Sequence, residues 1–218
     1  MKPTLLVISG WAHGIEAIKP MGDWVADHFE VQLLTGDQVL KKQSVPDADF
    51  IVTGSMGGLL AMELLPDTCK KLVLISSTAK FCAGDDYPCG TPERIMKRMI
   101  LQLKRNSDAV LEEFFKNVHF PQRQSRQAQQ LQRNENEDLV GGLEYLLTSD
   151  VRDRVSNIEI PVLLMHGAKD QIIPSTASEW LHEHLPYSQM KVYENGGHAL
   201  PAHHFQHVMT EIQSFLLA

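Results

Sequence analysis

Several protein classes are excluded by what this sequence has little of. It contains three cysteines in 218 residues, an odd number without metal-type spacing, so we expect free thiols in a reducing compartment rather than a disulfide framework. No apolar run approaches the ~18 residues of a membrane span, and the one near the start is too short for a signal peptide. The net charge of −7 argues against nucleic acid as the main partner. The composition therefore indicates a cytoplasmic protein that binds neither nucleic acid nor membrane.

What is present is the composition of a folded domain. Hydrophobic residues make up 43% of the chain and charged residues 22%, values typical of globular proteins. The length suffices for one domain with a full core, so we expect a single domain over residues 1–218.

Short apolar runs alternate with helical patterns along most of the chain. The runs are rich in Val, Ile and Leu without strict alternation, which is typical of strands buried on both faces of a parallel sheet. We expect six strands, at 4–9, 29–34, 49–54, 71–77, 161–167 and 190–195. Helices are expected between and after them, at 21–29, 55–65, 174–185 and 205–217. This order predicts a doubly wound α/β fold.

One long segment interrupts this alternation. Between the fourth and fifth expected strands the chain has only helical patterns, at 91–106, 107–118, 122–134 and 135–150. A segment of this length is too long for a loop. We expect a helical cap over about 81–150, inserted in a core of 1–80 and 151–218, because the sheet resumes directly after it. The alternative is an independent helical domain.

A cluster of small residues, VTGSMGG at 52–58, lies where the third expected strand meets a helix. A tight turn at this place can hold Ser55 above the carboxyl edge of the sheet as a nucleophile, since glycines let the backbone bend there. The usual pattern is G-x-S-x-G, and Gly57 fits it, but Thr53 stands in place of the first glycine. By itself the match is weak, and a plain glycine-rich loop remains the alternative.

A serine nucleophile needs a base and an acid that orients the base. Asp170 follows the fifth expected strand, and His198 follows the sixth after a glycine pair. Taken singly, they could be a turn acid and a surface histidine. The order Ser–Asp–His, each residue directly after its own strand, is nevertheless the order that this type of fold uses. We therefore predict a catalytic triad of Ser55, Asp170 and His198.

The segment SGWAHG after the first expected strand reaches the same edge of the sheet. The backbone N–H of Trp11 can supply one donor of an oxyanion hole, and that of Met56 the other. The alternative for Trp11 is a core residue at an ordinary turn.

The segments SGWAHG, GSMGG, HGAKDQIIP and GGHALP together resemble the α/β-hydrolase superfamily. Within it, residues 141–174 are similar to the biotin-pathway esterases that cleave pimeloyl-[acyl-carrier protein] methyl ester. The resemblance implies an α/β-hydrolase fold with about six mostly parallel strands and a helical cap. It also implies Ser55 as nucleophile, His198 as base, Asp170 as orienting acid, and Trp11 and Met56 as oxyanion donors. No metal and no organic cofactor is implied.

Two features depart from the family pattern. The oxyanion turn usually reads His-Gly-Trp, and here Ser9 takes the place of the histidine. The usual N-terminal hairpin is also expected to be absent, because the chain opens on the third strand of the standard fold.

Charge is distributed unevenly. Residues 92–133 hold nine basic and four acidic residues, a net charge of +5, while the rest of the chain carries −12. Acyl-carrier proteins are small and acidic, so Arg94, Lys97 and Arg98 are predicted to bind one that carries the substrate. The alternative is a solvated helix face.

Other residues give weaker signals. Phe114 and Phe115 are predicted to line an acyl pocket, although they could equally form the core of the cap. His203 and His207 are expected to share a helix face, but without further ligands nearby no metal site is expected. Cys82 and Cys89 could form a regulatory disulfide, and free thiols are the preferred reading.

The leading functional hypothesis is a carboxylesterase of biotin synthesis. The alternatives are a broad esterase or thioesterase for small, short-chain esters, a lyase of the menaquinone-pathway type, and a binding protein on a hydrolase scaffold. The lyase would need arginines of the cap to face the serine.

Overall fold

A computed structural model of the protein describes residues 2–123 and 138–218. Its centre is a six-stranded, fully parallel sheet with the strand order β2-β1-β3-β4-β5-β6. The strands are β1 (Thr4–Ile8), β2 (Glu30–Leu34), β3 (Phe50–Gly54), β4 (Lys71–Ile75), β5 (Val162–Gly167) and β6 (Ser188–Tyr193). The α/β architecture predicted from the sequence is thereby confirmed.

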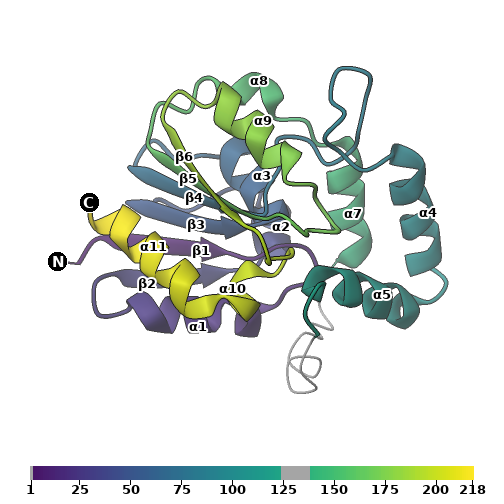
Figure 1. The fold of residues 1–218 in the computed structure, drawn as a ribbon, viewed down its shortest axis with the longest axis horizontal. Coiled ribbons are helices and arrows are strands. Elements are labelled where there is room, and N and C mark those ends of the chain that lie inside the picture. The colour runs from purple at the N-terminus through teal and green to yellow at the C-terminus, as the bar shows by residue number, and fades with distance from the viewer. Residues whose placement is uncertain (1, 124–137) are drawn as a thin grey trace.

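Helices cover both faces of the sheet (Figure 1). On one face α1 (Ile15–Val25) and α11 (Phe205–Leu217) pack side chains such as Met21 and Ile212 against the strands. The other face carries α2 (Gly36–Lys42), α3 (Met56–Glu63), α8 (Arg152–Val155) and α9 (Thr176–His184). The central strands are thus buried on both sides, which explains why their sequences are continuous apolar runs.

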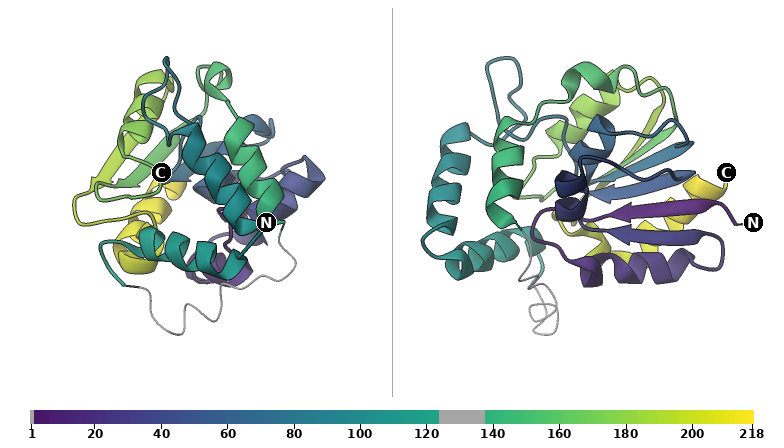
Figure 2. Two further views of the ribbon diagram at one scale, coloured as in Figure 1. Left: turned by 90° about the vertical axis from the view of Figure 1, so that its right-hand side faces the viewer. Right: turned by 180° about the vertical axis from the view of Figure 1, so that it is seen from behind.

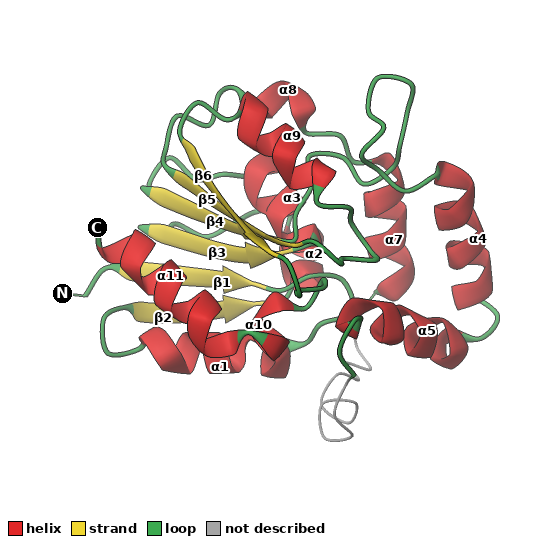
Figure 3. Ribbon diagram, in the orientation of Figure 1, coloured by secondary structure: helices red, strands yellow, loops and turns green. Residues whose placement is uncertain are grey.

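Three further helices lie beyond the ends of the strands. They are α4 (Glu93–Leu103), α5 (Ser107–His119) and α7 (Leu139–Thr148), called here the inserted helices. Figures 1 and 3 show that the strands point toward them, and Figure 2 shows α4 and α7 side by side with α5 running across one end of the pair. The inserted helices therefore stand over the carboxyl edge of the sheet.

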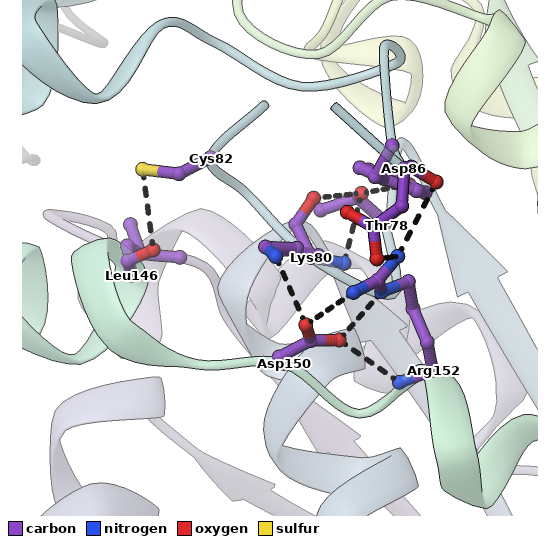
Figure 4. A network of polar contacts seen from close by, with 8 residues as sticks. Thr78, Lys80, Cys82, Asp86, Leu146, Asp150 and Arg152 are labelled. Atoms are coloured by element: carbon purple, nitrogen blue, oxygen red, sulfur yellow. Dashed lines mark hydrogen bonds and ion pairs between the residues drawn. The ribbon is translucent and has the colours of Figure 1, made fainter. Parts of the chain in front are cut away.

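A polar network ties the two ends of this insertion together (Figure 4). The carboxylate of Asp150 binds Lys80 at 3.0 Å and Arg152 at 2.8 Å, and Arg152 also reaches Asp86 at 2.9 Å. The backbone N–H of Val151 donates to the carbonyl of Ala79 at 2.9 Å. The chain leaves and re-enters the sheet region at one place, held by charge-assisted hydrogen bonds.

Several sequence-based boundaries were wrong. The first helix is α1 at Ile15–Val25, not 21–29, because it runs through Pro20, an interior position where the missing N–H of proline normally ends a helix. The last strand is β6 at Ser188–Tyr193, two residues earlier than expected, since an edge strand alternates in exposure and lacks a clear apolar run. The helix α2 was missed, although Thr35 and Gln38 form a capping box at its start.

Two other expectations concern helices near the ends of the insertion and the chain. His203 ends the short helix α10 (Leu200–His203) and His207 belongs to α11, so the two do not share one helix as predicted. The helix expected at 122–134 lies almost wholly outside the described residues.

Among the helices of residues 2–123 and 138–218, none is long and apolar enough to cross a membrane.

The three cysteines are free thiols. Cys69 and Cys82 are buried, and burial raises the pKa of both thiols, that of Cys69 to about 12. Cys82 lies against the carbonyl of Leu146 on α7, with a sulfur–oxygen distance of 3.9 Å (Figure 4). A buried thiol of high pKa is unreactive, so Cys82 acts here as a packing residue.

Candidate active site

Ser55 lies on a sharp turn between β3 and α3. Its φ of 52° and ψ of −119° place it in a region that residues with a side chain seldom occupy. A Cβ atom at Gly57 would lie 2.7 Å from the carbonyl oxygen of Ser9 and 2.9 Å from that of Ile8. Glycine is therefore required at Gly57, because the start of α3 passes directly over the end of β1. The turn holds the serine at the carboxyl edge of the sheet, as predicted.

The substitution of Thr for the first glycine of the pattern is accommodated within the sheet. Thr53 is buried, and its hydroxyl donates to the carbonyl of Val73 on β4 at 3.1 Å. The hydrogen bond thus compensates the cost of burying this hydroxyl. Thr53 leaves the turn at Ser55 intact.

His198 and Asp170 are brought together by the loops after β6 and β5. The ring nitrogen Nδ1 of His198 donates to Oδ2 of Asp170 at 2.7 Å, and both side chains are almost fully buried. A Cβ at Gly167 would lie 2.4 Å from the carbonyl oxygen of Gly197, so the two loops touch backbone to backbone. Because Nδ1 carries the proton, Nε2 of His198 is left as the hydrogen-bond acceptor.

The carboxylate of Asp170 is fully satisfied. Its Oδ1 accepts from the backbone N–H groups of Ile172 and Ile173 at 2.7 and 2.9 Å, while Oδ2 faces His198 and also His166 at 3.2 Å. Burial by itself raises the pKa of Asp170, but the two histidines and the hydrogen bonds outweigh it and hold the pKa below its usual range. Asp170 is therefore an ionised acceptor at neutral pH.

His166 was not assigned a role from the sequence, although it was quoted in the motif HGAKDQIIP. It is fully buried at the end of β5, and its Nε2 lies 2.9 Å from the carbonyl of Ile173 as well as near Asp170. Both partners only accept, so Nε2 carries the proton, and Nδ1 accepts from the hydroxyl of Ser178 at 2.7 Å. The spacing of four residues between His166 and Asp170 was the available signal.

Two cavities meet at Ser55. The larger has a volume of about 970 Å³ and lies under the inserted helices, where Trp11, Phe114 and Leu143 contribute to its walls. The smaller has a volume of about 360 Å³, lies on the side of α1 and α10, and is lined by Ser55 and His198 together. Ser55 and His198 thus line one cavity, and Asp170 is hydrogen-bonded to His198.

The predicted oxyanion donors flank the serine. A Cβ at Gly10 would lie 3.1 Å from Cβ of Ser55, so the segment leading to Trp11 passes beside the serine. Among the described residues, neither the backbone N–H of Trp11 nor that of Met56 donates a hydrogen bond. Ser9, in the position usual for histidine, donates its hydroxyl to the carbonyl of His13. This bond closes the turn within the segment.

The indole of Trp11 connects the sheet to the inserted helices. Its Nε1 donates to the carbonyl of Leu139 at 2.9 Å, and its ring meets that of Phe114 edge to face at 4.7 Å. A Cβ at Gly142 would lie 2.5 Å from the Trp11 ring, so α7 packs directly on it. Both Phe114 and Phe115 were predicted to line an acyl pocket; Phe114 lines the larger cavity, whereas Phe115 lines neither cavity and packs on His13.

Of the three residues predicted to bind a carrier protein, only two line the larger cavity. Arg94 and Arg98 line the larger cavity, while Lys97 pairs with Glu93 at 2.6 Å and is absent from its lining. Arg105 was not singled out and also lines the cavity.

The C-terminal end of α5 is bound to the loop that carries His198. The backbone N–H of Ala199 donates to the carbonyl of Val118 at 3.1 Å, and Nδ1 of His119 lies 2.8 Å from Nε2 of His203. Burial, followed by the neighbouring histidines, lowers the pKa of His119 to about 4, and burial also lowers the pKa of His203, so this pair is neutral at physiological pH.

The fold and the site together define a class of protein. An all-parallel sheet with a serine on a tight turn after β3, and a buried His–Asp pair in the loops after the last two strands, characterises an α/β hydrolase. Solved structures agree: an esterase from Exiguobacterium antarcticum superposes with a TM-score of 0.85 at 20% identity, covering 100% of this chain and 93% of that one. A bromoperoxidase from Bacillus anthracis superposes with a TM-score of 0.86 at 17% identity and the same coverage.

The family described as serine aminopeptidase, S33 matches residues 14–203, and the chain belongs to this family of hydrolases. Among curated relatives, the pimeloyl-[acyl-carrier protein] methyl ester esterase of Neisseria meningitidis is 31% identical over 194 residues, which cover 80% of this chain and 70% of that protein. The enzyme of the same name from Nitrosomonas europaea is 31% identical over 156 residues, and this match spans 62% of its length and 66% of this chain. The resemblance seen in the sequence motifs is thus confirmed.

Proposed function

We propose that this hydrolase is a serine carboxylesterase that cleaves pimeloyl-[acyl-carrier protein] methyl ester to the free pimeloyl-carrier and methanol. The observation that carries the proposal is the buried hydrogen-bonded pair of His198 and Asp170, of which His198 lines one cavity together with Ser55. The names of the relatives support the choice of substrate. In biotin synthesis such a protein acts in the cytoplasm.

The mechanism follows from the tautomer of His198. Because Nδ1 donates to Asp170, Nε2 accepts the proton of Ser55 as its Oγ attacks the ester carbonyl. The backbone N–H groups of Trp11 and Met56 stabilise the oxyanion. His198 then returns the proton to the leaving methanol, and a water molecule repeats the cycle to free the acid. No step of this mechanism needs a metal or an organic cofactor.

The inserted helices form the cap of this proposal and the larger cavity is the acyl site. A volume of about 970 Å³ lined by Phe114, Leu143 and Leu146 suits an extended aliphatic chain. Arg94 and Arg98 on α4 face the same cavity and form no ion pair in the described part of the chain. Arginines at this place attract an acidic carrier protein that presents the chain.

Hydrolysis of the pimeloyl-carrier methyl ester, measured beside hydrolysis of p-nitrophenyl acetate, tests the proposal. We expect both activities to be lost in Ser55→Ala, with the carrier-bound ester the better substrate by kcat/KM. Cleavage of the small ester alone would indicate a broad short-chain esterase and reject the carrier substrate.

Charge reversal tests the carrier site separately. Arg94→Glu combined with Arg98→Glu should lower kcat/KM for the carrier-bound ester by about tenfold or more and spare p-nitrophenyl acetate. Lys42→Glu, an exposed site at the end of α2, is the matched control. Equal losses on both substrates would contradict a docking role.

One observation favours a second candidate. Arg94, Arg98 and Arg105 line the cavity that Ser55 also lines, which is the arrangement required of a lyase acting on an anionic substrate. A lyase of the menaquinone-pathway type would consume its anionic substrate without cleaving either ester. Assay of such a substrate is worthwhile only if both esters remain intact.

A further inference from the structure

The smaller cavity at Ser55 is larger than the proposed reaction needs. Its volume of about 360 Å³ exceeds by an order of magnitude the ~30 Å³ that one water molecule occupies. Methanol adds a single carbon to that size. A methyl ester therefore leaves most of the cavity unfilled.

The position of His198 indicates which part of the ester, acyl chain or alcohol, this cavity holds. The leaving oxygen must receive a proton from Nε2 of His198, so the alcohol moiety lies on the side of the histidine. Of the two cavities, the smaller is lined by His198 and by the segment that follows it, including Ala199, Pro201 and Ala202. The lining of the larger cavity includes Ser55 but not His198. The acyl chain and the alcohol thus lie in different cavities, with Ser55 between them.

The lining defines the chemistry of the alcohol. Ile18 and Met21 of α1 and Phe205 of α11 give the cavity an apolar wall. Glu16, also in the lining, is exposed and would repel an anionic alcohol. His13 offers no positive charge, because burial lowers its pKa to about 4 despite the hydrogen bond that its Nδ1 donates to the carbonyl of Trp11 at 2.8 Å.

We propose that the smaller cavity is an alcohol-binding site for a neutral aliphatic alcohol larger than methanol. The inference rests on the proposed serine-esterase function and broadens its substrate class. Butyl esters occupy more of the site, whereas methyl esters occupy only the part next to Ser55.

Methyl and butyl hexanoate, which share one acyl chain, test the proposal in wild-type protein and in Ser55→Ala. We expect Ser55-dependent hydrolysis of both, with kcat/KM for the butyl ester at least fivefold higher. A butyl ester cleaved less well than the methyl ester would overturn the alcohol site while leaving the esterase intact. Absence of Ser55-dependent hydrolysis of either ester would overturn both.

Narrowing the cavity from its rim gives a second measurement. Ala17 and Ala202 line it and are exposed, so a tryptophan at either position obstructs the cavity without entering the core. Ala17→Trp and Ala202→Trp should each lower the ratio of butyl to methyl kcat/KM by tenfold or more. Ala26→Trp, exposed at the end of the same helix α1 and outside the lining, should keep the wild-type ratio. An unchanged ratio in both rim variants would reject the site.

A third measurement uses the wild-type protein alone. During hydrolysis of p-nitrophenyl hexanoate, 1-butanol can replace water in attacking the acyl-enzyme and release butyl hexanoate. Binding of butanol in the cavity predicts that formation of this ester saturates with butanol concentration. A strictly linear dependence up to the solubility of butanol would show that no such site exists.

Discussion

Replacing Asp170 with asparagine should abolish most of the activity by reversing one hydrogen bond. In the wild type, Oδ1 accepts from the N–H groups of Ile172 and Ile173, and Oδ2 accepts from His198 and His166. The single oxygen of an asparagine must stay with the two backbone donors, because its NH₂ group cannot accept from them. The NH₂ group then faces the two histidines and donates where a carboxylate accepted.

This reversal dictates the wrong tautomer of His198. With an N–H donor opposite, Nδ1 must lose its proton, so Nε2 carries it and cannot take the proton of Ser55. We expect Asp170→Asn to lower kcat by about 10³- to 10⁴-fold, which corresponds to ~4–5.4 kcal/mol in activation free energy.

The assay is hydrolysis of p-nitrophenyl acetate by the purified variant, with thermal denaturation measured on the same sample. Asp23→Asn, at an exposed ion pair with Lys19 on α1, is the matched control and should retain full activity. A loss below tenfold in Asp170→Asn, in a folded protein, would refute the assignment of Asp170 as the orienting acid.

Four further predictions concern stability and coupling. Gly57→Ala should cost about 1–3 kcal/mol of unfolding free energy by forcing a Cβ against two backbone carbonyls, measured by urea denaturation. Asp150→Asn should cost about 1–2 kcal/mol by weakening the network at the base of the insertion, and a change below 0.3 kcal/mol would contradict that role. Because the pKa of Asp170 is lowered in the folded state, its contribution to stability is present above about pH 4 and is lost as the pH falls further; Asp170→Asn should remove this part of the acid dependence. His119→Ala removes the contact of α5 with His203 and should lower kcat several-fold, whereas an unchanged kcat would show that the contact does not position the loop after β6.

Much of the sheet was predictable because strands buried on both faces have continuous apolar sequences. The runs that became β1, β3 and β4 are continuous and apolar, since neighbours cover both faces of each strand. At β6 the signal failed, because an edge strand has half-exposed residues and its limits depend on pairing with β5. The prediction of α1 failed because Pro20 signals a helix boundary in the sequence, whereas the packing of Ile18 and Met21 on the sheet stabilises a helix that runs through it.

The candidate site was predictable as a set of residues but not as an arrangement. Position after a strand identified Ser55, Asp170 and His198, because carboxyl ends of parallel strands meet at one edge. Nothing in the sequence distinguished Phe114, which lines the larger cavity, from Phe115, which packs on His13. The difference arises from the rotation of α5 about its axis, which only its contacts with neighbouring elements determine.

The sequence by itself indicated the succession of the strands and of most helices, the turn at Ser55 and the residues that follow the strands, because these depend on local apolar patterns and on small residues that allow backbones to approach closely. Only the tertiary structure decided that His166 supports Asp170, that Thr53 is satisfied by a carbonyl of β4, and that two cavities meet at the serine. These features join residues far apart in the chain. Their geometry depends on how sheet, helices and insertion pack together, which no local pattern records.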